Sequence, residues 1–600
     1  MDIKNNRLFL IFGLFLVILL LPVSAQDTQS IRFHSSNFDY LAPNSDLILL
    51  PYDDWSMIGT WSYYGLPDFT TSHYYNGMRV RDPLFGNQPV NWLNVRNSLV
   101  NYQKNKINVN SIQFQKKKLF TKFNYYQGDY SFKLFDLIVG QKFSEKFSWT
   151  FYGKNIGYDG GYGLYGPYFT NGGESVSQSY HLDCFFQIGE WESMAGIGYN
   201  KFRPGLLNYS ENYYSPEEQY LQWNHQSYMN EWKINNYIRF ERQTADSTYL
   251  GFNIANYFYR SNYSDFPLKA EGRSMSAKFQ RYFYAGETRF QVRIEPLIQT
   301  AYYKYHESQN QSVVTSKINY ADSVFQGDLN FSLGAANLTP LYTLNYQKNL
   351  LKKLAVGLEI KNQYNFYPLA YFAPQEWNKE KLNDEHFISN HYSASLQYHG
   401  ENLNNELKIS HQQASFQIPF QNSPNDSLIK FQEVELPSLY IFDNFKLELP
   451  WQGQLSGKII FTPEDDDNFL QLQGFASYRQ YLSPVLEFTA GVFPDWLGFF
   501  QYYFNQLAEN MTPYLAVNSS YLQGGNNIFW FQEFQNLGKT ATNYFTNKRV
   551  NINFRVGFRV DTFHFFFAMY NAEGRQFSSV SGMPFRNRLQ VLGVEWSFMN

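Results

Sequence analysis

The stretch from Arg549 to Asp561, RVNINFRVGFRVD, alternates between two kinds of side chain. Its even-numbered residues from Val550 to Val560 are all apolar, whereas the odd-numbered ones between them are Asn, Arg or Gly. A period of two indicates a β-strand whose two faces meet different surroundings. Arg555 and Arg559 share the polar face, which argues against the dry core of two packed sheets on that side. The pattern predicts one face toward water and one toward an apolar phase.

The same alternation recurs along most of the chain, for example over residues 231–241, 290–295, 356–361 and 592–598. It places Arg239, Arg293 and Glu295 on the polar face. A soluble β-sandwich also alternates, but the aromatic content favours another class. With 12 Trp, 49 Tyr and 57 Phe, a fifth of the residues are aromatic, yet the mean hydropathy is -0.45. In a transmembrane β-barrel only alternate residues face lipid, and aromatic side chains ring both interfaces. We therefore predict an all-β, antiparallel, up-and-down transmembrane barrel.

The N-terminus has the features of a secretory signal peptide. Lys4 and Arg7 precede an apolar run over 8–21, and Val-Ser-Ala leads to a cleavage site between Ala25 and Gln26. The alternative is a membrane-anchoring helix, but the run is short for a full span. Residues 1–25 are thus expected to be removed on export, and the barrel to reside in the outer membrane of a Gram-negative bacterium.

Connections divide this barrel into strands. Short polar turns, as at 143–146 and 401–404, alternate with longer stretches that include 158–175 and 494–548, which we assign to outer loops. Counting strands from residue 118 to residue 600 gives about 22, with a range of 18 to 24. A barrel of that size has a wide lumen and is usually plugged.

Residues 74–95, YYNGMRVRDPLFGNQPVNWLNV, suggest what fills the lumen. The Asn76-Gly77 turn and the Asp82-Pro83 pair resemble the last part of the plug domain of TonB-dependent receptors. The C-terminal stretch 583–598, MPFRNRLQVLGVEWSF, resembles the final barrel strand of the same family. The resemblance implies a barrel over 118–600 preceded by a plug-like segment over 26–117, as in porins of Bacteroidetes-like bacteria.

The chain departs from that family at its N-terminus. Residues 26–117 are short for a full plug, and DTQSIRF, near the expected mature N-terminus, is a poor match to a TonB box. These departures argue against transport driven by TonB, and the sequence leaves driven and passive transport both open.

No motif of enzyme chemistry occurs in the sequence, and we predict no catalytic residue, cofactor or metal site. His181 and Cys184 are more typical of strand packing than of a metal site. The acidic run 464–467 has no known calcium-loop spacing. The formal net charge of -3 gives no electrostatic reason to bind nucleic acid.

These features predict an outer-membrane channel, or a receptor-like barrel, through which small solutes pass. The expected partners are outer-membrane lipid and a small-molecule solute. The alternative is a non-transporting barrel, which would serve as a structural or assembly partner of another outer-membrane or periplasmic protein, or bind ligands through its outer loops.

Overall fold

The computed structural model describes residues 48–51, 59–62, 66–86, 98–103 and 106–129. From residue 131 onward it describes the strands and several of the short connections between them. The predicted signal peptide, with Ala25 and Gln26, lies outside the described residues. None of the described helices is long and apolar enough to cross a membrane.

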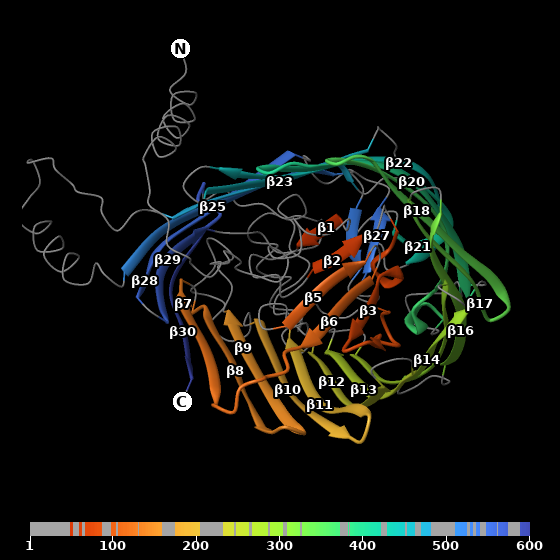
Figure 1. Ribbon diagram of the computed structural model, residues 1–600, viewed down its shortest axis with the longest axis horizontal. Coiled ribbons are helices and arrows are strands. Elements are labelled where there is room, and N and C mark those ends of the chain that lie inside the picture. Colours follow the sequence, from red (N-terminus) through yellow and green to blue (C-terminus); the bar gives the residue numbers. More distant parts are fainter. Residues whose placement is uncertain are drawn as a thin grey trace, which may run out of the picture.

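The wall of the barrel consists of 22 strands in the part of the chain that the structure describes (Figure 1). Each strand pairs antiparallel with the next, β25 pairs directly with β28, and β30 pairs with β7, which closes the barrel. The predicted fold class and strand number are confirmed. The wall strands are β7 (Phe120–Gly128), β8 (Lys133–Ser144), β9 (Phe147–Tyr158), β10 (Ser175–Ile188), β11 (Trp191–Arg203), β12 (Trp232–Thr244), β13 (Thr248–Asn262), β14 (Pro267–Ala285), β15 (Thr288–Tyr303), β16 (Gln309–Val324), β17 (Gly327–Ala336), β18 (Thr339–Leu351), β19 (Leu354–Phe366), β20 (His386–His399), β21 (Leu403–Gln421), β22 (Lys430–Leu449), β23 (Gly453–Phe461), β24 (Leu470–Tyr481), β25 (Met511–Gly524), β28 (Lys548–Val560), β29 (Phe563–Tyr570) and β30 (Leu589–Met599).

The strand bounds put most short connections at one rim, which we call the short-turn rim, and most long ones at the other. One assignment was wrong: residues 494–548 are not a single outer loop, because β25 lies within them. The strand was hidden because Asn518, Ser519 and Ser520 interrupt its alternation. The acidic run 464–467 falls between β23 and β24, outside the described residues.

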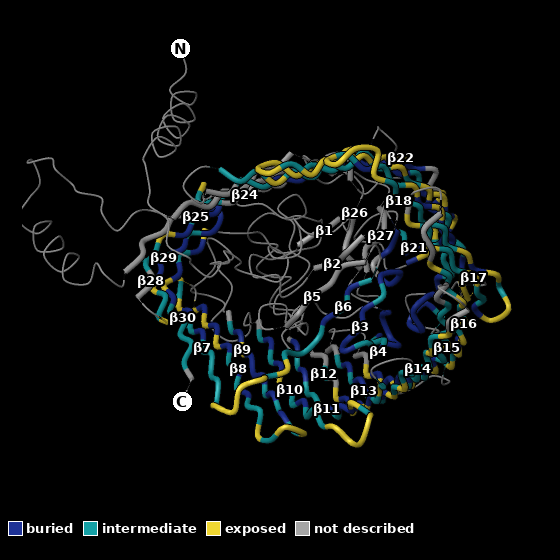
Figure 2. The backbone as a smooth tube through the Cα atoms, viewed as in Figure 1, coloured by how far each residue is buried: buried dark blue, intermediate teal, exposed yellow. Residues whose placement is uncertain are grey.

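The two faces of the wall differ as the alternation predicts. Val556 is 45% exposed on the outer face of β28, whereas its neighbour Arg555 is 1% exposed on the lumen side. On β30, Leu592 is exposed and Val591 is buried. In Figure 2 buried residues alternate with less buried ones along many wall strands, and exposed residues mark several of the turns. The outer face is rich in exposed Ile, Leu, Phe and Tyr, which suits contact with lipid.

Two small sheets lie inside the ring of strands (Figure 1). One pairs β1 (Ile48–Pro51) with β2 (Gly59–Ser62). The other, which we call the inner sheet, has the order β4-β3-β6-β5. Its strands are β3 (Ser72–Tyr75), β4 (Met78–Val80), β5 (Ser98–Gln103) and β6 (Lys106–Ser111).

Two further elements come from the connections. The hairpin of β26 (Ile528–Phe531) and β27 (Asn536–Thr540), between β25 and β28, pairs with the end of β21 through Phe420 and Gln421. Short 3-10 turns precede β3 (η2, Asp68–Thr70) and follow β19 (η6, Leu369–Tyr371).

Candidate functional site

The inner sheet meets the wall at a buried charged cluster. Arg239 of β12 donates to Asp183 of β10, with 2.7 Å between Nη2 and Oδ1, and its Nε lies 3.1 Å from Glu241 Oε1. Arg239 and Asp183 are almost wholly buried. Because an ionised side chain is costly to bury alone, each of these charges depends on its partner.

Two residues of the inner sheet complete this cluster. The Tyr75 hydroxyl donates to Asp183 Oδ2 at 3.3 Å, and the Ser111 hydroxyl donates to the same oxygen. The Arg239 guanidinium lies over the Tyr75 ring, 4.4 Å from its centroid. The Tyr75 ring also stacks on His181 at 5.6 Å. The end of β3 and the end of β6 are thereby fixed to β10 and β12.

The predicted Asn76-Gly77 turn is the β3–β4 connection and lies against the wall. Both residues have positive φ, 47° and 81°, as a two-residue hairpin turn of type I′ requires. Tyr249 donates to the Asn76 carbonyl at 3.3 Å, and Lys278 donates to the Gly77 carbonyl at 3.2 Å. The Asn76 side chain bonds to Ser111, both to its backbone N–H and to its hydroxyl.

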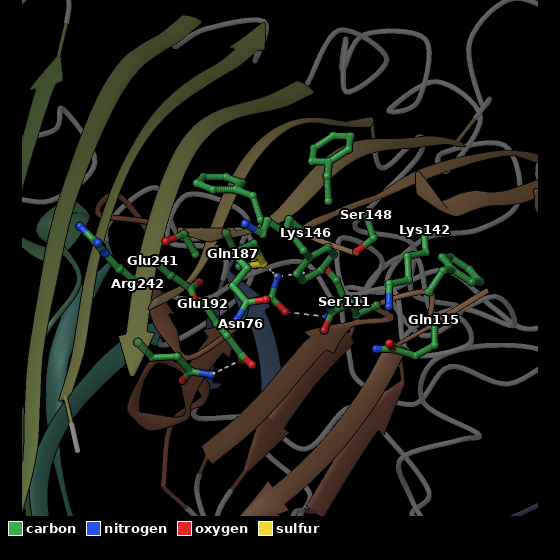
Figure 3. Close-up of a pocket in the computed structure, with 18 of the residues that line it drawn as sticks. Asn76, Ser111, Gln115, Lys142, Lys146, Ser148, Gln187, Glu192, Glu241 and Arg242 are labelled. Carbon is green, nitrogen blue, oxygen red and sulfur yellow. Dashed lines mark hydrogen bonds between the residues drawn. The ribbon is translucent and has the colours of Figure 1, made fainter. Parts of the chain in front are cut away.

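Beside this turn lies a cavity of about 770 Å³ (Figure 3). Its lining combines the inner sheet with the short-turn rim of the wall, and includes Asn76, Ser111, Lys142, Gln187, Glu192 and Glu241. In Figure 3 Asn76 and Ser111 face each other across a hydrogen bond at the centre of the view. The lining carries charges of both signs and many amides, a mixture that does not single out one ligand class.

The Arg81-Asp82-Pro83 stretch forms a second attachment. Arg81 donates to the Phe366 carbonyl at 2.8 Å and lies over the Phe366 ring at 3.7 Å. Asp82 turns the chain by accepting the Leu84 N–H at 2.8 Å. The Pro83 carbonyl accepts the Leu369 N–H at 3.0 Å, which joins the segment to η6.

Aromatic rings surround this second attachment. Phe69 lies 5.7 Å from Tyr367, 5.8 Å from Tyr371 and 6.3 Å from Phe387, measured between ring centroids. Gly86, at φ 77°, permits this packing, because a Cβ there would lie 2.6 Å from Phe69 Cβ and 3.1 Å from Pro368. This attachment is chiefly apolar, in contrast to the charged cluster.

Burial sets the ionisation of the N-terminal segment. Desolvation, with Arg79 and Arg81 nearby, lowers the pKa of His73 to about 3, so this imidazole is neutral at pH 7. Desolvation also raises the pKa of Tyr75, with Asp183 adding to the effect. The Tyr75 hydroxyl therefore keeps its proton and remains a donor to Asp183.

The structure places the predicted lumen-facing residues in separate groups. Arg293 and Glu295 form an ion pair on β15, and the Arg293 guanidinium lies 5.5 Å from the centre of the Tyr74 ring. Arg555 is on another part of the wall, paired with Glu595 at 2.8 Å. Arg559 belongs to β28, but its side chain is outside the described residues.

Sequence reasoning missed Asp183, Tyr75 and Ser111. Alternation does put His181 and Asp183 on one face of β10, but only the strand register brings Arg239 to them. Cys184 lies on the opposite face from His181, since the two are three positions apart along a strand. No group of three or more His, Cys, Asp or Glu side chains that could hold a metal ion occurs among the described residues.

The fold is that of known outer-membrane receptors. A single-site variant of the ferric enterobactin receptor of Pseudomonas aeruginosa matches with a TM-score of 0.69 at 9% identity, over 94% of this chain and 96% of that one. The chain has a TonB-dependent receptor fold. The siderophore receptor PirA of Acinetobacter baumannii matches at 0.68 and 8% identity, over 93% and 95%. The FrpB iron transporter of Neisseria meningitidis matches at 0.65 and 7% identity, over 94% and 96%.

The sequence comparisons add nothing to this likeness, because no protein-family model and no curated protein matches the chain. The three neighbours named here are receptors or a transporter. At such low identity the likeness establishes the fold, and the predicted TonB-receptor-like barrel is confirmed.

Proposed function

We propose that the chain is an outer-membrane barrel for the passage of small solutes, in which residues 26–117 act as a reduced plug. The observation that carries the proposal is the polar contact between the inner sheet and the wall. Tyr75, Ser111 and the Asn76-Gly77 turn are attached to β10, β13 and β14 by hydrogen bonds to side chains. Such contacts can be exchanged for water, so the segment can be displaced without unfolding the wall.

The lumen suits a polar solute. Its wall carries Arg239, Glu241 and Arg293 on strands whose outer faces are apolar. Once the inner sheet is displaced, side chains of this kind can form hydrogen bonds with a passing polar solute, which an apolar interior could not do. The neighbours named above are siderophore receptors or an iron transporter. Their likeness supports a role in transport for this chain. Its solute is to be found by experiment.

The residence proposed for the chain is the outer membrane of a Gram-negative bacterium. The fold and the predicted signal peptide support this proposal, and the expected mature N-terminus is Gln26. N-terminal sequencing of the protein from the outer-membrane fraction tests this point. A chain that retains Met1, or that is recovered in the soluble fraction, would contradict it.

The test of passage is single-channel recording in planar bilayers. The purified full-length protein is compared with a variant that lacks residues 30–105 behind the intact signal peptide. We expect the deletion variant to assemble and to conduct more, because the inner sheet no longer occupies the lumen. Heat-modifiable migration on gels shows that the barrel has assembled.

Two results would decide against the proposal. If the assembled deletion variant conducts no more than the full-length protein, residues 30–105 do not restrict passage. If neither protein conducts and a stable partner co-purifies with both, the non-transporting alternative is favoured.

A further inference from the structure

Two cationic side chains face each other on the lumen side of the wall. Arg293 of β15 and Lys317 of β16 are directly opposite in the register of these two strands. Both belong to the lumen face, because their neighbours Ile294 and Ile318 are exposed on the outer face. Like charges placed directly opposite each other destabilise a sheet. An anion lying between these two charges would offset that repulsion.

The inner sheet brings a third cation to this pair. Lys106, the first residue of β6, lies with its ammonium 5.8 Å from the centroid of the Tyr74 ring. The Arg293 guanidinium approaches the same ring to 5.5 Å. Burial lowers the pKa of the Lys106 ammonium well below its usual value, and the charges of Arg293 and Lys317 lower this pKa further. The three cations are therefore close enough to repel one another.

The carboxylates of the wall leave this part of the lumen positively charged. Glu295 is the carboxylate beside the three cations, and it is bonded to the Arg293 guanidinium. The flanking charges come in pairs of opposite sign and add nothing to the sum. These flanking residues are Lys278 of β14 with Glu241 of β12, and Lys361 with Glu359 of β19.

The three cations border open space within the barrel. The side chains of Arg293 and Glu295 are 20% and 14% exposed, and Lys106 and Lys317 are half-buried. Because these side chains lie inside the ring of strands, their exposed parts face the lumen and not the membrane (Figure 1). A small solute in the lumen can therefore reach all three cations.

The combination of one Arg and two Lys side chains suits a phosphate group. A guanidinium presents several N–H donors in a planar fork, and an ammonium is a compact charge with three donors. Both are common partners of phosphate oxygens. A phosphate dianion also neutralises two cations at once, which a single carboxylate does not do.

We propose that Arg293, Lys317 and Lys106 form a binding site for a phosphate group between the wall and the inner sheet. The inference rests on the proposed function and deepens it, because it gives the solute a chemical class, namely phosphate or a small phosphorylated molecule. Arg293 and Lys317 belong to the wall, whereas Lys106 belongs to the segment that we propose as the plug. Displacement of that segment divides the site and releases the anion.

The test is protection of Lys106 from acetylation by inorganic phosphate. The full-length protein in dodecyl maltoside micelles is treated with sulfosuccinimidyl acetate, and mass spectrometry gives the acetylation rate of each lysine. Sodium chloride is lowered as phosphate is added, so that the ionic strength stays constant. Lys352, which is exposed in the turn between β18 and β19, is the internal reference.

We expect phosphate to slow acetylation of Lys106 and to leave that of Lys352 unchanged. Lys317→Gln should raise the phosphate concentration that gives half protection at least about tenfold, as the loss of one charged hydrogen bond implies. Lys317→Arg keeps the charge and should keep most of the protection. The matched control Lys352→Gln removes the same charge outside the site and should leave the protection of Lys106 unchanged.

A second variant covers the case in which Lys317→Gln does not assemble. Lys106→Gln alters the inner sheet and leaves the wall strands intact, and acetylation of Lys317 then reports binding. Phosphate should protect Lys317 in the wild type and at least about tenfold less tightly in Lys106→Gln.

Equal acetylation of Lys106 with and without phosphate, or equal protection of Lys106 and Lys352, would overturn the phosphate site. Bilayer conductance of the variant lacking residues 30–105 tests passage separately. Increased conductance without protection of Lys106 refutes the phosphate site alone. Protection of Lys106 without increased conductance supports the site and refutes the role of the segment in passage.

Discussion

Removal of the Asp183 carboxylate should release the inner sheet from the wall. Among the described residues, Asp183→Ala leaves buried Arg239 with Glu241 as its remaining ion-pair partner, and it removes the acceptor of Tyr75 and Ser111. Loss of one member of a buried ion pair costs about 3–5 kcal/mol. At about 1.4 kcal/mol per tenfold, the population with the inner sheet detached should rise at least a hundredfold.

Limited proteolysis of the folded barrel measures that population. When detachment and reattachment are fast, the cleavage rate within the N-terminal segment follows the fraction that is detached. Asp183→Asn keeps an acceptor for the two hydroxyls and isolates the contribution of the charge, so its effect should be smaller. Lys446→Ala is the control, since it breaks an exposed pair with Glu448 at 2.9 Å, and such pairs contribute less than about 1 kcal/mol.

A cleavage rate in Asp183→Ala within a factor of about ten of the wild type would refute this reasoning. It would mean that the charged cluster stabilises the wall and not the attachment of the inner sheet. A change of the same size in Lys446→Ala would point to a general loosening of the barrel.

Three further predictions concern single features. Val556→Arg should prevent assembly of the barrel, because Arg on the lipid face costs roughly 2–4 kcal/mol. The control Thr562→Arg, in a turn, should assemble normally, and heat-modifiable migration on gels reports assembly of both variants. Lowering the pH from 7.5 to 5 should destabilise the folded N-terminal segment by about 2 kcal/mol. Folding lowers the pKa of His73 from 6.5 to about 3, so at pH 5 His73 binds a proton in the unfolded segment but not in the folded one. This contribution to stability is therefore present above pH 6.5 and is lost as the pH falls. Cleavage by papain at both pH values measures the loss, and His73→Phe should remove this contribution to the pH dependence. Gly77→Ala should lower the stability of the N-terminal segment by about 1–2 kcal/mol in the same assay, because φ at this position is 81° and the new Cβ would lie 3.0 Å from the Tyr249 hydroxyl. An unchanged cleavage rate would show that the turn can relax.

The faces of the wall could be predicted from the sequence because they follow from alternation alone. Arg239 and Arg555 lie on the lumen side and Val556 faces outward, as a period of two requires. The Asn76-Gly77 turn could be predicted for a similar reason, since its conformation is determined by two adjacent residues. The division into a plug-like segment over 26–117 and a barrel over 118–600 stays a prediction.

The charged cluster could not be predicted, because its members are distant in sequence. Asp183 and Arg239 are 56 residues apart, and Tyr75 lies 108 residues before Asp183. Their meeting depends on the register of β10, β11 and β12 and on the position of the inner sheet. The turn between β17 and β18 could not be predicted for another reason. It is formed by Asn337 and Leu338, and Leu lacks the turn signature that Gly would have supplied.

The two attachments of the N-terminal segment differ in chemistry, and this difference constrains how the segment can leave. At Asp183 the contacts are ionic and hydrogen-bonded, and water can replace each of them. At Arg81 the segment is held by edge-to-face and tilted contacts between aromatic rings and by backbone hydrogen bonds to η6, where detachment exposes apolar surface that water does not solvate. The charged end can therefore open while the aromatic end stays closed. Because Arg81 is attached to Phe366 at the aromatic end, partial displacement would widen the lumen at the short-turn rim while the segment stays attached to β19.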